Sequence, residues 1–193
     1  MTTNSNIKHT KRLLPGMLCN SVEFFNYELE VKVIMNGTIK KFYEPPTPIY
    51  QLLNEEMHRH PKAFQILKDW HPESESKQIE TFARCRYGDL ENTGDIVDGK
   101  FSSAEFWDCP LRGSCKGEGI ICALPNYKGE TLSGDEVQLL KMLTTAMTND
   151  AIAGALTIAL GTFHQLKQKL YAKLGGIQTK QEATIKALEL NII

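Results

Sequence analysis

The sequence predicts an α+β fold in two parts: an N-terminal domain with a β-hairpin, short helices and a cysteine-rich loop region, and a C-terminal domain of four helices. Three observations predict it: apolar residues alternate with polar ones before Asn36-Gly37, four cysteines fall between residues 85 and 122, and helical periodicity fills residues 133–193. The boundaries are a flexible N-terminus over 1–12, the α+β domain over 13–128 and the helical domain over 131–193.

The charge and hydropathy of the chain argue against two classes of protein, namely uniformly basic nucleic-acid-binding proteins and membrane proteins. A formal net charge of -1 excludes a protein that coats nucleic acid with a uniformly basic surface. Residues 161–193 nevertheless hold five lysines against two glutamates, so this end of the chain is mildly basic. No N-terminal signal sequence is visible, and the longest weakly polar run, residues 151–160, is shorter than the ~20 residues of a membrane span. We therefore expect a soluble, cytoplasmic protein without a membrane partner.

The first predicted elements form the hairpin. Period-two spacing predicts one half-buried strand, with an apolar face made of Phe25, Tyr27, Leu29, Val31 and Val33. Asn36-Gly37 is the preferred pair of a type I′ turn, because both positions tolerate a positive φ. The return strand is expected over residues 39–43.

Short helices follow the hairpin. Thr47-Pro48 predicts an N-cap and a first helical residue, with a helix up to His60-Pro61 and a second helix over Pro61–Trp70. Residues 71–77 and 89–103 are polar and predict loops, whereas residues 79–84 fit a helix or a strand.

Four clustered cysteines predict a metal site. Cys85, Cys109, Cys115 and Cys122 are separated by 23, 5 and 6 residues, and without a secretion signal such clustering favours a metal over disulfides. Four thiolates complete a tetrahedral Zn²⁺ shell or hold an iron–sulfur cluster. Glycines in the intervening segment allow sharp turns, and Arg112 and Lys116 would offset thiolate charge.

Zn²⁺ is the expected cofactor, because a closed zinc site adds folding energy to a loop-rich domain. An iron–sulfur cluster is the alternative, and small buried cysteines packed as apolar groups are a third interpretation. His58, His60 and His71 are substitute ligands, although each is more typical of a surface histidine.

The last third of the chain predicts four helices. Ser133 is an N-cap for the first, and Thr148 or Asn149 caps a short second helix. A third helix over residues 160–174 buries Phe163, Leu166, Leu170 and Leu174, and a fourth covers about 180–190, after Gly175-Gly176. Two short helices joined by a three- to four-residue turn are typical of a helix-turn-helix.

Residues 132–174 resemble the LuxR-type (GerE-like) DNA-binding domain of bacterial transcription regulators. The resemblance starts at Leu132, Ser133 and Glu136 and continues without a gap through Ala146–Ala153, which follows the family's "glycine, x, Ser/Thr, Asn, x, x, Ile, Ala" segment. Its later matching positions are Leu156, Ile158, Thr162, Phe163, Lys173 and Leu174. His164, Gly161 and Leu166 depart from the family, as does one residue inserted around Gly175-Gly176, and these changes remove cations from the DNA face.

The resemblance implies that the third helix enters the major groove of double-stranded DNA and that the protein is a homodimer through its fourth helix, with Ala183, Ala187 and Leu190 in contact. The predicted DNA-binding residues are Thr148, Asn149, Thr162, His164, Gln165, Lys167, Gln168 and Lys169. Gln reads adenine with two hydrogen bonds, and Lys attracts phosphate.

The function predicted from the sequence is therefore a DNA-binding transcription regulator whose N-terminal domain is metal-stabilised or sensing. A protein-interaction adaptor and an iron–sulfur redox sensor that controls DNA binding are the alternatives. An enzyme is not expected, because the sequence holds no nucleophile–base pair, P-loop or zincin motif and so offers no catalytic residues.

Overall fold

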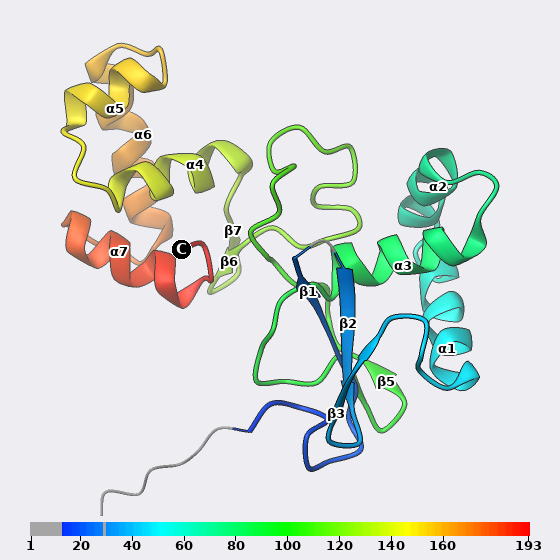
Figure 1. Cartoon of the computed structure of the whole chain (residues 1–193). Coiled ribbons are helices and arrows are strands. Elements are labelled where there is room, and N and C mark those ends of the chain that lie inside the picture. Colours follow the sequence, from blue (N-terminus) through cyan, green and yellow to red (C-terminus); the bar gives the residue numbers. More distant parts are fainter. Residues whose placement is uncertain (1–12, 29) are drawn as a thin grey trace, which may run out of the picture.

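The computed structural model describes residues 13–28 and 30–193 and has an α+β architecture. A three-stranded antiparallel sheet is followed by three helices, two small hairpins and four more helices (Figure 1). The predicted flexible N-terminus, residues 1–12, lies outside the described residues, and so does Leu29.

The sheet contains β1 (Glu23–Tyr27), β2 (Glu30–Met35) and β3 (Thr38–Lys41), in that order. Met35 pairs with Thr38 across a two-residue turn in which Asn36 has φ 49° and Gly37 has φ 73°. Positive φ at both positions is what a type I′ turn requires, so the predicted hairpin is confirmed.

The prediction of a single strand before this turn is wrong. The chain reverses after β1, where Glu28 has φ 56°, and Tyr27 pairs with Glu30 on the next strand. Tyr27 is consequently 58% exposed, whereas Phe24, on the opposite face of the strand, is fully buried. Alternation alone does not reveal such a break, because the polar–apolar period continues through the turn.

Three helices follow the sheet: α1 (Thr47–His58), α2 (Pro61–Trp70) and α3 (Glu75–Arg86). The bounds of α2 are those predicted, but Thr47 is the first residue of α1 and no side chain caps this helix. The undecided segment at 79–84 is helical. Helix α3 begins inside the predicted loop, because Ser74 Oγ accepts a hydrogen bond from the Lys77 N–H at 3.4 Å.

Helix α3 joins the sheet to the other two helices. It contacts β1 and β2 as well as α1 and α2, and its Phe82 is fully buried. The ring of Phe82 meets that of Tyr87 edge-on, with 6.1 Å between the centroids. After α3, the region predicted as a loop contains a small hairpin of two short strands, β4 (Ile96–Val97) and β5 (Lys100–Phe101). An isolated antiparallel β-bridge between Val22 and Ile96 connects this hairpin to the segment that leads into β1.

The C-terminal part, called the helical module here, comprises residues 132–193. It follows a hairpin of β6 (Asn126–Tyr127) and β7 (Glu130–Thr131) and contains α4 (Gly134–Leu143), α5 (Asn149–Ala155), α6 (Leu160–Lys173) and α7 (Lys180–Glu189). Its buried side chains form a cluster separate from that of the N-terminal part. Ser133 caps α4 and Thr148 caps α5, as predicted.

Two details of the predicted packing are wrong. Leu166 is 41% exposed, because the third helix turns it away from the core that holds Phe163 and Leu170. Ala183 and Ala187 are fully buried in the helical module itself, so these two alanines are not accessible for the expected dimer contact. Leu190 is half-buried against the same core.

The segment from residue 102 to residue 125, called the junction loop here, lies between the two parts and contains neither helix nor strand (Figure 1). Phe106 of this loop packs against the core of the helical module, and Asp108 forms a salt bridge with Lys141 of α4. A further contact runs from Asn191 Nδ2 to Asp89 Oδ2 at 3.0 Å. The junction loop therefore supplies much of the contact between the two parts.

Candidate functional site

Helices α5 and α6 are held by local hydrogen bonds in a compact helix–turn–helix arrangement. Thr148 Oγ1 accepts from the Ala151 N–H at 3.2 Å, which satisfies one of the amides left free at the start of α5. The turn passes through Thr157, with φ 57°, and the Ile158 N–H donates to the Ala153 carbonyl at 3.0 Å. The start and the direction of α6 are therefore fixed relative to α5.

One side of α6 is polar and exposed. Phe163, Leu170 and Leu174 are fully buried on its inner side. Five of the predicted DNA-binding residues are exposed at other positions of the helix: Thr162, His164, Gln165, Gln168 and Lys169. At about 100° per residue, Gln165 and Gln168 lie nearly opposite Phe163. The structure thus brings these five residues to one accessible surface, called the α6 face here.

The other three predicted residues are not part of the α6 face. Lys167 is half-buried, with its Nζ 5.3 Å from the ring centroid of Tyr171. This cation–π contact turns the ammonium group toward the module. Thr148 uses its hydroxyl in the cap of α5, and Asn149, the first residue of that helix, is half-buried.

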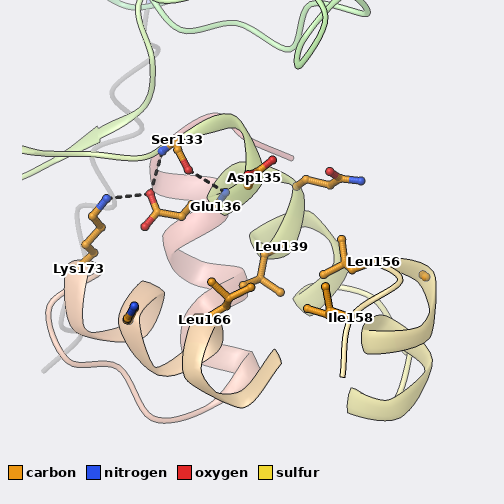
Figure 2. Close-up of a pocket in the computed structure, with 11 residues that line it drawn as sticks. Ser133, Asp135, Glu136, Leu139, Leu156, Ile158, Leu166 and Lys173 are labelled. Carbon is orange, nitrogen blue, oxygen red and sulfur yellow. Dashed lines mark hydrogen bonds and ion pairs between the residues drawn. The ribbon is translucent and has the colours of Figure 1, made fainter. Parts of the chain in front are cut away.

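A cleft of about 570 Å³ lies beside the α6 face, between α4, the α5–α6 turn and α6. Figure 2 shows apolar side chains gathered around it: Leu139, Leu156, Ile158 and Leu166. At its polar end, Lys173 Nζ donates to Glu136 Oε2 at 2.8 Å. Burial acts to raise the pKa of Glu136, but the hydrogen bonds from Lys173 and Ser133 outweigh it and hold this pKa below its ordinary value.

The four cysteines predicted as metal ligands line one small cavity of about 20 Å³. Cys85 comes from α3, whereas the other three, Cys109, Cys115 and Cys122, come from the junction loop. All four are half-buried free thiols. Cys19 lies elsewhere, exposed, with its Sγ 2.8 Å from Ser21 Oγ.

Two N–H groups donate to sulfurs of this cavity, namely Gly117 N–H to Cys115 Sγ at 3.3 Å and Arg112 Nη1 to Cys122 Sγ at 3.4 Å. Arg112 also donates to the carbonyls of Trp107 and Ala123, at 2.9 and 3.1 Å. Lys116, the other cation expected to offset thiolate charge, is exposed. Of these two cations, Arg112 is the one for which a hydrogen bond to a sulfur is seen among the described residues.

The thiols affect each other electrostatically. Burial raises the pKa of Cys85 to about 12, and the neighbouring thiols of Cys122, Cys109 and Cys115 add to the rise. Burial also raises the pKa of Cys109. The free protein therefore holds Cys85 as a neutral thiol at pH 7.

Across residues 13–28 and 30–193, no three His, Cys, Asp or Glu side chains are grouped closely enough to hold a metal ion as they stand. The histidines considered as substitute ligands lie away from the cysteine cavity. His58 Nδ1 is 2.8 Å from the Asn54 carbonyl, His60 Nε2 is 2.9 Å from Glu56 Oε1, and His71 Nε2 is 3.0 Å from Thr81 Oγ1.

Three buried carboxyl groups were not predicted from the sequence. They belong to Glu23, Asp95 and Glu105, which accept backbone N–H groups of Glu91 at 2.9 Å, Phe24 at 2.6 Å and Asp89 at 3.1 Å. Glu23 Oε2 and Glu105 Oε1 are buried without a hydrogen-bond partner among the described residues. No local pattern reveals this cluster, since its members are brought together only by the tertiary fold.

Their surroundings favour the protonated forms. Burial raises the pKa of Glu23 to about 8, although the Glu91 N–H opposes the shift. Burial also raises the pKa of Asp95 and of Glu105, and the negative charge of Glu105 raises the pKa of Asp95 further. Each of the three carboxyl groups is therefore harder to ionise in the folded protein than in the unfolded chain.

Comparison with known proteins does not assign the chain to a family. No family model, curated protein or solved structure matches the chain. Within the described residues, no helix is long and apolar enough to cross a membrane. Functional inference therefore rests on the geometry of the chain itself.

Proposed function

We propose that the protein is a DNA-binding transcription regulator and that α6 is its recognition helix. The observation that carries the proposal is the α6 face, where Gln165 and Gln168 project from the side opposite the buried Phe163, with Lys169 beside them. Glutamine amides recognise the major-groove edge of adenine, and an exposed lysine attracts phosphate. The resemblance of residues 132–174 to the LuxR-type domain supports the same assignment.

The chain has no net positive charge for non-specific attraction, since its formal net charge is -1. Lys173 is engaged by Glu136, and Lys167 is directed toward Tyr171. Specific binding would therefore depend on base contacts and on doubling the site in a homodimer. Ile185 and Leu188 of α7 are 54% and 57% exposed, and they replace the buried alanines as the proposed dimer contact.

Replacing both Gln165 and Gln168 with Ala should weaken specific binding by about 1–3 kcal/mol for each hydrogen-bonded base pair that they no longer recognise. A duplex is first selected from a random library with the wild-type protein, and its affinity is then measured for each variant over a range of salt concentrations. Gln181→Ala, an exposed glutamine on α7, is the matched control and should bind as the wild type does. Equal affinity of the double variant and the control would contradict the assignment of the α6 face.

A protein-interaction adaptor is the second candidate, and the apolar cleft beside Leu166 favours it. The same titration separates the two functions. DNA binding through phosphate contacts weakens steeply with salt, whereas an adaptor would select no duplex from the library.

Dimerisation has its own test. Replacing Ile185 and Leu188 with Glu should convert a dimer into a monomer, because it places charges in an apolar contact. Light scattering coupled to gel filtration measures the mass, and Gln181→Glu, at an exposed position of the same helix, controls for added negative charge. A wild type that stays monomeric at every concentration would contradict the dimer proposal.

A further inference from the structure

Most of the cysteine cavity is built from a segment that has no helix or strand of its own. The junction loop runs for 24 residues, from 102 to 125, without helix or strand. Apart from Pro125, Ile121 is its one aliphatic side chain that is fully buried. Structureless segments of this length inside a compact fold are uncommon and are usually functional. Polar contacts and any further cross-link therefore matter more for the order of this loop than burial of aliphatic side chains does.

Two of the four sulfurs accept N–H groups from the surrounding chain. The Gly117 amide and the Arg112 guanidinium donate to Cys115 Sγ and Cys122 Sγ, which are the N–H···S contacts that stabilise metal-bound sulfur. Gly117 also allows the close packing of this turn, because an added Cβ would lie 2.9 Å from Ile121 Cδ1 and from Trp70 Cη2.

The acidic group nearest the sulfurs is neutralised. Glu118 lines the cavity, but its Oε2 accepts the Gly113 N–H at 2.7 Å and its Oε1 lies 3.6 Å from Arg112 Nη1. The Arg112 guanidinium thus pairs with the Glu118 carboxylate and also contacts Cys122 Sγ. Four thiolates around Zn²⁺ would carry a net charge of about -2, and Arg112 would lie in contact with one of these sulfurs.

We propose that Cys85, Cys109, Cys115 and Cys122 bind one metal centre through four thiolates and that this centre orders the junction loop. The sulfurs need only draw together, and three of the four belong to a segment without helix or strand. Each thiol loses its proton to solvent as it binds, so loading with Zn²⁺ releases protons. The expected centre is Zn²⁺, and an iron–sulfur cluster is the other occupant of the same ligand set.

The proposal does not depend on DNA binding, and metal analysis of the full-length protein, purified anaerobically without chelators, tests it directly. One zinc per chain in a colourless protein identifies the zinc form. Iron with inorganic sulfide, and a visible absorption that bleaches in air, identifies the cluster. Cys115→Ser should lower the metal content at least ~10-fold, whereas Cys19→Ser should leave it unchanged. Metal-free wild-type protein would overturn the proposal.

A second measurement uses wild-type protein, so that the test still holds if Cys115→Ser does not fold. Co²⁺ is added to wild-type protein whose native metal has been removed, and the four thiols should give a tetrahedral Co²⁺ spectrum while losing their reactivity toward a thiol reagent. Far-ultraviolet circular dichroism before and after metal removal shows whether the helices persist. Thiols that react equally with and without Co²⁺ would overturn the proposal, as would equal metal loss in Cys19→Ser and Cys115→Ser.

Discussion

The free energy of unfolding should fall as the pH rises from about 5 to 8, and Glu23→Gln should remove a large part of that fall. Burial raises the pKa of Glu23 to about 8 from an ordinary value of 4.5. Between these two values the folded protein keeps a proton that the unfolded chain releases. The favourable contribution is therefore complete below about pH 4.5 and is lost as the pH rises through about 8.

The expected size is about 2–4 kcal/mol across this window, since one pKa unit corresponds to about 1.4 kcal/mol. Glutamine keeps the oxygen that accepts the Glu91 N–H but has no carboxyl proton to lose. Glu23→Gln should therefore be more stable than the wild type at pH 8 and less sensitive to pH. The slope will not vanish, because burial also raises the pKa values of Asp95 and Glu105.

Urea unfolding at a series of pH values measures this effect. Glu55→Gln is the matched control, because Glu55 is exposed on α1. It should leave the pH dependence of the wild type unchanged. Parallel stability curves for Glu23→Gln and the control would show that Glu23 is ionised in the folded protein throughout this range.

The helical module was the most predictable part of the chain, because its helix boundaries are encoded locally. Ser133 and Thr148 each accept the amide three residues ahead, and the Gly176 N–H closes α6 onto the Tyr171 carbonyl at 2.9 Å. These signals lie within a few residues of the structure they produce. The outward direction of Leu166 was missed, because apolar character alone does not decide which edge of an amphipathic helix is covered.

The N-terminal part was less predictable because its decisive features are non-local. The reversal after Tyr27 replaces one predicted strand with two, and no Gly or Pro marks it. In the sequence, Glu23 is typical of a polar residue on a surface strand. Only the fold shows that its carboxyl group is buried in one cluster with those of Asp95 and Glu105. Cysteine spacing did indicate a shared site, but only the fold shows that Cys85 of α3 and the junction loop line one cavity.

Arg112 connects that cavity to the rest of the molecule, and Arg112→Met should cost about 3–5 kcal/mol of unfolding free energy. The side chains of Arg112 and Glu118 are only 13% and 15% exposed. Removing the guanidinium therefore leaves the largely buried Glu118 carboxylate without its cation. It also removes the donors to the Trp107 and Ala123 carbonyls, which are strong charge-assisted hydrogen bonds. Methionine fills much of the volume but supplies none of these donors.

The effect should reach both the cysteine cavity and the helical module. On one side, Arg112 donates to Cys122 Sγ, and removal of such a hydrogen bond typically weakens metal binding by about 10–100-fold. On the other side, its guanidinium carbon lies 4.4 Å from the ring centroid of Phe106, which packs against the helical module. We therefore expect Arg112→Met to speed amide hydrogen exchange in α4 as well as to lower the unfolding midpoint.

Lys116→Met is the matched control, because it removes the same charge from an exposed position on the same loop. Its effect on the free energy of unfolding should stay within about 0.5 kcal/mol. Competition with a chelator compares the metal affinities of the two variants, and urea unfolding compares their stabilities. If both variants behave alike, the contribution of Arg112 is only its charge, and its hydrogen bonds to Cys122 Sγ and to the Trp107 and Ala123 carbonyls carry no measurable free energy.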